Sequence, residues 1–172
     1  TFRAQASALY DVFRYLNFPA ELDDKLVITP EFRELINYTQ NPVPGNGIVV
    51  AGIHLSNFDL ALHILTRSGT RALIITLAEL PGGYQNQFDQ RRSSGAELVT
   101  ASVGTFRLAI QRLKAGGVVA TGIDRPIPPN KHAPHFFGHP APLPTHYITL
   151  ALKAQVPVRL MAVQTLPDGR YS

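Results

Sequence analysis

Short strand-like runs alternate with helical segments along residues 47–163, and this alternation constrains the fold more than any other feature. The strand-like runs cover residues 47–53, 71–77, 97–100, 118–122 and 156–163. The first is apolar and β-branched, which is typical of a strand buried on both faces. Segments of helical pattern cover residues 56–67, 84–94, 105–115 and 145–154. The alternation predicts an α/β fold, with a mostly parallel or mixed sheet flanked by helices.

The first 40 residues have a different pattern. Four apolar residues recur at helical spacing and predict a helix over residues 4–17: Leu9, Val12, Phe13 and Leu16. A second helix is expected over residues 30–39, because Pro30 suits the first position of a helix. We expect a single domain over residues 1–172, in which N-terminal helices (1–40) pack against an α/β core (41–172). The chain starts at Thr1, and we expect it to be part of a longer protein.

The charge distribution favours an anionic partner. The net charge is +4 and the basic excess lies in residues 41–172, which suits phosphate esters or acidic lipid headgroups. The sequence has no run of Lys and Arg and no basic stripe interleaved with aromatic residues, so nucleic acid is not an expected partner. The absence of cysteine excludes disulfides and thiolate metal sites. No apolar stretch approaches the roughly 20 residues of a membrane-spanning helix.

The segment from Gly52 to Asp59 carries the strongest indication of chemistry. His54 follows a predicted strand, and Asp59 falls in the first turn of the next helix. Ligands of open α/β sheets bind outside the carboxyl ends of the strands. A carboxylate on one imidazole nitrogen fixes the tautomer and leaves the other nitrogen free as a base. We therefore predict His54 as a general base with Asp59 as its partner.

A structural interpretation of the same residues stays open. Ser56 and Asp59 have the spacing of a capping box, in which Asp59 would only close the start of the helix. His54 would then be an ordinary polar residue at the end of a strand. The two roles are compatible, because a carboxylate has two oxygens.

Other candidate site residues lie in two further segments. Asp124 and Arg125 follow the strand over residues 118–122, so they are expected near His54, where an arginine suits a phosphate or carboxylate. An ordinary surface turn is the alternative for this pair. Arg91, in the polar helix over residues 84–94, is a further candidate for an anionic ligand. Phe137 would line an acyl slot, touch lipid or plug the core.

The long loop over residues 124–144, with the helix after it, is rich in histidine: His132, His135, His139 and His146. Zinc is one interpretation, because neutral imidazole is a common zinc ligand. The spacings match no standard ligand pair, and no carboxylate nearby completes a set, so no metal ligand is assigned. A solvated loop is the alternative.

Several motifs in order resemble the lysophospholipid acyltransferase superfamily, in particular its bacterial lipid A and phosphatidylinositol-mannoside acyltransferase branch. His54-x-x-x-x-Asp59 resembles the family's catalytic HxxxxD motif. Four further segments resemble later family motifs, and the likeness covers most of residues 8–165: Leu113–Ala120, Asp124-Arg125, Phe136–Ala141 with Pro144-Thr145, and Val156–Val158. The lipid A branch usually has Glu at the second motif position, so Asp59 points toward other branches.

The resemblance implies an enzyme with a glycerol-3-phosphate acyltransferase-like fold. It would move a fatty acyl group from an acyl-CoA or acyl-carrier-protein thioester to a hydroxyl of a lipid or glycolipid acceptor, without a cofactor. His54 and Asp59 would be catalytic. Candidate oxyanion donors are the backbone N–H groups at Asn57 and Phe58 and, as an alternative, the side chain of Arg125. Asn57, Asp124, Arg125, Arg91 and Phe137 would contact substrate. The expected location is the cytoplasmic face of the cell membrane, held peripherally or by a segment outside this chain.

Two other classes of function stay open beside the acyltransferase. A non-catalytic α/β module that binds anionic lipid would keep its binding when His54 and Asp59 are both replaced by Ala. A metal-dependent hydrolase that uses the histidine-rich loop would contain zinc, which replacement of His132 and His135 would remove. Acyl chain length, the donor, the acceptor and the oligomeric state are not determined by the sequence.

Overall fold

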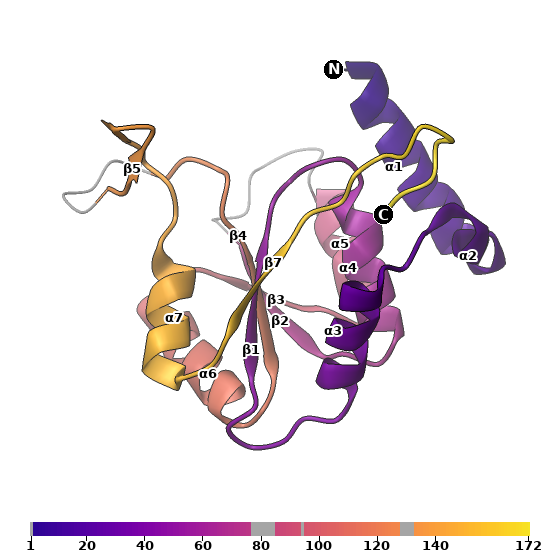
Figure 1. The fold of residues 1–172 in the computed structure, drawn as a ribbon. Helices are drawn as coiled ribbons and strands as arrows, with labels where there is room; N and C mark the ends of the chain where they lie inside the picture. The colour runs from indigo at the N-terminus through magenta and orange to yellow at the C-terminus, as the bar shows by residue number, and fades with distance from the viewer. Residues whose placement is uncertain (1, 77–84, 94, 128–132) are drawn as a thin grey trace.

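A five-stranded parallel sheet forms the centre of the molecule. The computed structural model describes residues 2–76, 85–93, 95–127 and 133–172. The strands lie in the order β3-β2-β4-β1-β7, and every neighbouring pair is parallel. Their bounds are β1 Ile48–Gly52, β2 Ala72–Thr76, β3 Glu97–Thr100, β4 Val118–Gly122 and β7 Val158–Met161. This confirms the predicted α/β fold and makes the sheet wholly parallel (Figure 1).

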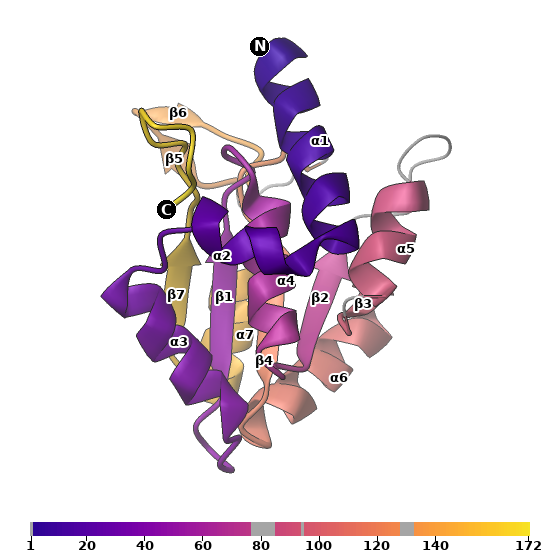
Figure 2. The same ribbon diagram turned by 90° about the vertical axis from the view of Figure 1, so that its right-hand side faces the viewer.

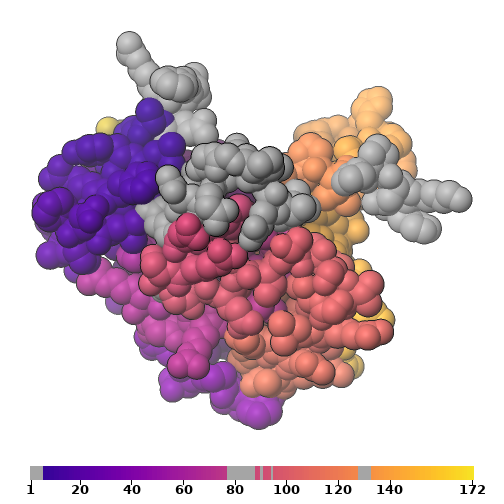
Figure 3. Space-filling model, turned by 180° about the vertical axis from the view of Figure 1, so that it is seen from behind, coloured from indigo at the N-terminus to yellow at the C-terminus, as the bar shows by residue number. Residues whose placement is uncertain are grey.

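Helices cover both faces of the sheet, which explains why the central strands are apolar on both sides. The helices between the strands are α4 Phe58–Arg67, α5 Gln85–Ser93, α6 Val103–Lys114 and α7 His146–Ala154. α6 and α7 pack on the face that includes Val49, Leu73 and Val119. α4 packs on the opposite face through Leu62. From behind, α5 and α6 form much of the visible surface (Figure 3).

The N-terminal helices pack on α4 and, through Leu35, on the same face of the sheet. These elements are α1 Phe2–Asn17, the 3-10 helix η1 Pro19–Glu21, α2 Leu22–Lys25 and α3 Pro30–Gln40. α1 and α3 confirm the predicted helices over 4–17 and 30–39, and Thr29 caps α3 by accepting a hydrogen bond from the N–H of Phe32 (3.2 Å). η1 and α2 were not predicted from the sequence. In Figure 2, α2 crosses in front of α4 and α3 lies beside α4.

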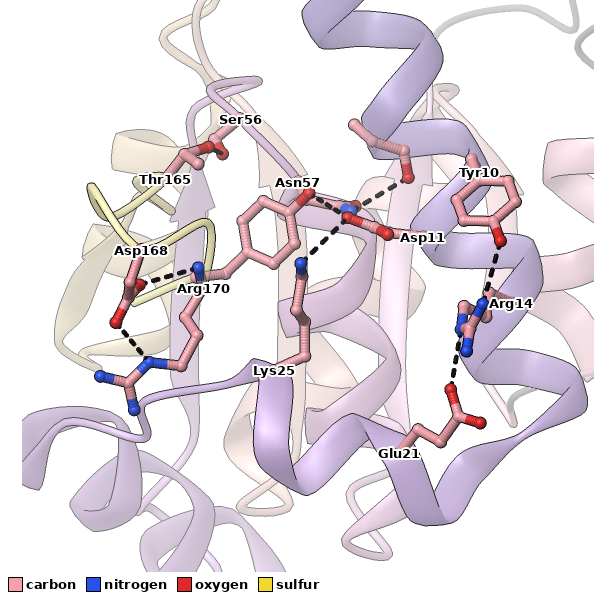
Figure 4. Close-up of polar contacts among 12 residues, drawn as sticks. Tyr10, Asp11, Arg14, Glu21, Lys25, Ser56, Asn57, Thr165, Asp168 and Arg170 are labelled. Atoms are coloured by element: carbon pink, nitrogen blue, oxygen red, sulfur yellow. Dashed lines mark hydrogen bonds and ion pairs between the residues drawn. The ribbon is translucent and has the colours of Figure 1, made fainter.

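Buried polar contacts tie α1 to the rest of the molecule (Figure 4). The hydroxyl of Tyr171, near the C-terminal end of the chain, donates to Asp11 of α1 (2.6 Å). Lys25 lies 4.0 Å from the same carboxylate. The side-chain amide of Asn57 donates to the carbonyl of Ala8 (3.0 Å). α1 is therefore joined to the residue that immediately precedes α4.

The loop over residues 124–144 contains a small hairpin that the sequence did not predict. β5 His135–Phe136 pairs with β6 His139–Pro140 in an antiparallel arrangement. The hairpin projects beyond the carboxyl ends of the sheet strands (Figures 1 and 2). Two backbone hydrogen bonds join the segments on either side of the hairpin. The N–H of Ile127 donates to the carbonyl of Pro142, and the N–H of Ala141 donates to the carbonyl of Pro134 (both 2.7 Å).

Candidate active site

Parallel pairing brings two short loops together at the carboxyl end of the sheet. Gly52, the last residue of β1, is in register with Gly122, the last residue of β4. His54 and Asp124 each follow two residues later. Because the two strands are neighbours and run in the same direction, the side chains meet although 70 positions separate them in sequence.

Asp124 holds His54 through both of its carboxylate oxygens. Nδ1 of the imidazole lies 2.6 Å from Oδ1 of Asp124, and the backbone N–H of His54 donates to Oδ2 (2.8 Å). Burial opposes the charged form of Asp124, but the hydrogen bonds from His54 outweigh it, so the pKa of this carboxyl lies below its ordinary value. The pair fixes the ring and places Nδ1 against a carboxylate. Nε2 has no hydrogen-bond partner among the described residues.

The imidazole fits between an aromatic ring and a glycine. Phe58 contacts it edge to face, with ring centroids 4.5 Å apart and planes at 77°. On the sheet side, a Cβ added to Gly122 would lie only 2.5 Å from Cε1 of His54. Any side chain at position 122 would therefore displace the ring, and the glycine is part of what positions His54.

Asp59 does not pair with His54, which corrects the pairing predicted from the HxxxxD spacing. Among the described residues no hydrogen bond or ion pair joins the two side chains. Asp59 instead accepts a hydrogen bond from Nε of Arg91 in α5 (2.8 Å), and the Arg91 guanidinium lies 5.5 Å from the centre of the Phe58 ring. The neighbouring strand β4 supplies the carboxylate at His54, a contact between distant segments that local spacing does not reveal.

The structure contradicts the capping box and gives the side chain of Asn57 a partner in α1. α4 begins at Phe58 with Asn57 as its N-cap residue, and no side chain caps it. Ser56 has a positive φ of 52° and bonds to Thr165 (2.6 Å). The side chain of Asn57 is buried and bound to Ala8, so it holds α1 and does not line the cavity beside His54.

An apolar cavity of about 200 Å³ opens beside His54. Its walls come from the carboxyl halves of β1, β2 and β4 and from α4, and are mainly aliphatic and aromatic: Val50, Phe58, Leu62, Ile74, Ala120 and Met161. An apolar cavity with a few polar groups suits a ligand that has an apolar chain and a polar reactive group. The chain would fill the cavity, and the reactive group would lie beside the polar side chains.

Two arginines predicted to bind substrate line this cavity. Arg91 is one of them, and its Nε donates a hydrogen bond to Asp59. Arg125 is exposed, and no hydrogen bond or ion pair joins it to any part of the chain that the structure describes. A guanidinium without a protein partner can receive a phosphate or carboxylate through two parallel hydrogen bonds.

His146 and Thr121 form a polar pair in the cavity wall that the sequence did not reveal. Nε2 of His146 lies 2.9 Å from the hydroxyl of Thr121, and the ring packs against Phe106. Burial lowers the pKa of His146, so the ring is neutral near pH 7. In the sequence, this pair could be suspected only from the position of Thr121 near the end of a strand. Many residues with a purely structural role occupy such positions.

The remaining site predictions fall outside the cavity. Phe137 lies at the hairpin tip with 88% of its surface exposed, so it neither lines the cavity nor plugs the core. His135 and His139 lie in the hairpin strands, apart from His146 in α7, while His132 lies outside the described residues. Within the described part of the chain, no cluster of three or more His, Asp or Glu side chains is placed to hold a metal ion.

The chain matches a known protein family over its whole length. The family model described as "Bacterial lipid A biosynthesis acyltransferase" matches residues 1–172. The chain belongs to this family. The match confirms the resemblance inferred from the motifs and makes the protein a lipid acyltransferase at the level of the family. No curated protein matches the chain. Among the described residues, no helix of this family member has the length and apolarity needed to span a membrane.

Proposed function

We propose that the protein transfers a fatty acyl group from an acyl thioester to a hydroxyl of a lipid or glycolipid, with His54 as the general base and Asp124 as its orienting partner. The observation that carries this proposal is the His54–Asp124 pair at the mouth of an apolar cavity. The pair leaves Nε2 free to accept a proton, and the cavity suits an acyl chain.

The chemistry needs only groups that this chain provides. Nε2 of His54 removes the proton of the acceptor hydroxyl as its oxygen attacks the thioester carbonyl. The new C–O bond forms, the C–S bond breaks, and the proton passes from the imidazolium to the departing thiolate. Asp124 stabilises the imidazolium in between. A thioester is already activated, so the reaction requires no cofactor.

The developing oxyanion needs hydrogen-bond donors. The backbone N–H groups of Asn57 and Phe58 precede the first internal hydrogen bonds of α4, and neither has a partner among the described residues. They are our candidates for this role. Arg125 and Arg91 would hold a phosphate of the donor or acceptor. Asp59 would act through Arg91 by fixing the orientation of its guanidinium.

The donor would be acyl-CoA or an acyl-carrier protein, both of which carry the thioester on a phosphorylated arm. The acceptor lipid places the reaction at a membrane surface, and the thioester places it on the cytoplasmic side. A cationic rim formed by Arg91 and Arg125 suits either donor.

Thiol release from each donor, measured with and without a bacterial lipid extract, tests the proposal. Wild-type protein should release thiol only when lipid is present, and His54→Ala should lower the rate by about 100-fold or more. Gln111→Ala, which removes an exposed polar side chain of α6 outside the cavity, is the control and should keep the wild-type rate. Lipid-dependent release that is unchanged in His54→Ala would contradict the proposed base.

Two other outcomes would also be informative. Thiol release without lipid would indicate hydrolysis of the thioester at the same site. Lipid binding without thiol release from either donor would favour a non-catalytic module that binds anionic lipid.

A further inference from the structure

The tip of the β5–β6 hairpin presents two phenylalanines to solvent. Phe136 is 59% exposed and Phe137 88% exposed. Their rings contact each other edge to face, with centroids 4.6 Å apart. A Cβ added to the neighbouring Gly138 would meet nothing within 4 Å. The tip therefore stands clear of the rest of the described protein, and these rings contribute nothing to its core.

The turn holds Phe137 in a conformation that an aromatic residue rarely adopts. φ is +50° at Phe137 and +80° at Gly138, so both central residues are left-handed, as in the tight turns that suit two-residue hairpins. Asn or Gly is favoured at the first of these positions. A phenylalanine there is disfavoured for folding, and its ring is directed outward. This combination indicates a function for the exposed ring.

The hairpin and the cavity share one edge of the molecule. Arg125, just before the loop, and Pro144, just after the hairpin, both line the cavity. The hairpin projects from the carboxyl ends of the strands, and α1 extends past the same edge on the other side of the sheet (Figures 1 and 3). The hairpin tip and the cavity beside His54 therefore lie at the same edge of the sheet, formed by the carboxyl ends of its strands.

We infer that the Phe136–Phe137 tip inserts into the interfacial region of an anionic lipid bilayer and brings the cavity to that surface. The inference rests on the proposed lipid acceptor. Two phenylalanine side chains provide about 150–250 Å² each, well below the about 800 Å² per partner of a stable protein interface. Two exposed aromatic rings can insert into a fluid bilayer without shape complementarity. Arg125 and the net charge of +4 favour anionic headgroups.

A single fluorophore can test the insertion, because the sequence contains no tryptophan. Phe137→Trp places an indole at the tip, and Leu152→Trp, at a position 72% exposed on α7, is the matched control. With phosphatidylcholine–phosphatidylglycerol vesicles, the emission of Phe137→Trp should shift to shorter wavelength and be quenched by brominated lipid. The emission of Leu152→Trp should stay unchanged. No shift in Phe137→Trp would overturn the inference.

Vesicle sedimentation gives a second, independent measurement. Phe136→Ser/Phe137→Ser should bind the same vesicles about tenfold or more weakly than wild type. Leu152→Ser/Leu160→Ser removes two apolar residues of similar exposure (72% and 70%) and should bind like wild type. Equal binding by all three proteins would overturn the inference, and thermal melting verifies that each variant is folded.

The remaining outcomes separate the lipid from other partners. Binding should weaken on neutral vesicles and at high salt, and equal binding to neutral vesicles would contradict the role of anionic headgroups. A lipid-free emission shift that grows with protein concentration would mean that a second copy covers the tip, and would overturn the inference. Neither tryptophan emission nor vesicle sedimentation depends on His54. Membrane insertion can therefore be tested even if the protein does not transfer acyl groups.

Discussion

At the residue scale, two carboxylates near His54 have different partners. Asp124 contacts the imidazole directly, while Asp59 contacts Arg91. A carboxylate that orients a histidine and stabilises its charged form acts on the chemical step. A carboxylate that orients an arginine acts on the binding of whatever anion the arginine holds. The two aspartates should therefore have separable kinetic effects.

We expect Asp124→Asn to lower kcat by about 100-fold, because the amide keeps the size of the side chain and loses the charge that stabilises the imidazolium. Asp59→Asn is the matched variant and should act mainly by raising KM. Steady-state kinetics with varied donor and acceptor distinguish them. The reverse ranking, with kcat lost only in Asp59→Asn, would mean that the predicted HxxxxD pair operates during turnover.

Gly122→Ala tests how tightly the imidazole is held. The added methyl would lie 2.5 Å from Cε1 of His54, so the ring must move off its position and kcat should fall by about tenfold or more. Gly104→Ala is the control, because its added methyl would meet only Ser102, at 3.7 Å. Full activity in Gly122→Ala would show that His54 works from another rotamer.

At the element scale, α1 is attached through polar contacts as well as packing. Asp11, Tyr171 and Asn57 join α1, the C-terminal segment and the start of α4 (Figure 4). Val12 and Tyr15 of α1 pack in the same cluster as Leu60 of α4. The residue that precedes α4 is thus supported from outside the sheet, which helps to hold the corner that carries His54.

Tyr171→Phe should lower the free energy of unfolding at pH 8 by about 1.5–3 kcal/mol, the usual value for a hydrogen bond to a charged group. Burial and the hydrogen bond to Asp11 raise the pKa of Tyr171 to about 12. The ordinary value is about 10, so the contribution is fully present below about pH 10 and is lost as pH rises through about 12. Urea unfolding of both proteins at pH 8 and pH 11 should therefore give a smaller difference at pH 11. A difference that stays constant would mean that the hydroxyl is not bonded to Asp11.

At the scale of the whole molecule, strand order decides where chemistry can occur. β1 and β4 are central neighbours, and their following loops carry His54 and Asp124. The hairpin and α1 extend past the same edge of the sheet (Figure 1). One edge of the molecule therefore holds the proposed base, the apolar cavity and the exposed aromatic tip, an arrangement suited to an acceptor that stays in a membrane.

The sequence alone determined the strands of the main sheet, the longer helices and the family. Apolar runs and helical spacing are local properties, so they located every strand of the main sheet, and ordered motifs indicated the acyltransferase family that the comparison confirms. His54 was identified because a strand end followed by a helix start is visible in sequence. The hairpin, η1 and α2 were not predicted, because they are too short for periodicity to detect.

Only the tertiary structure decided which side chains meet. Local spacing favoured Asp59 as the partner of His54, but the register of Gly52 with Gly122 brings Asp124 there from a neighbouring strand. Asp124 was predicted to lie near His54, yet its bond to the ring depends on strand order, which no local pattern encodes. The same holds for the Arg91–Asp59 pair and for the Thr121–His146 pair. Hydrophobic periodicity determines elements because it acts over a few residues, whereas a site requires contacts that form only when the sheet assembles.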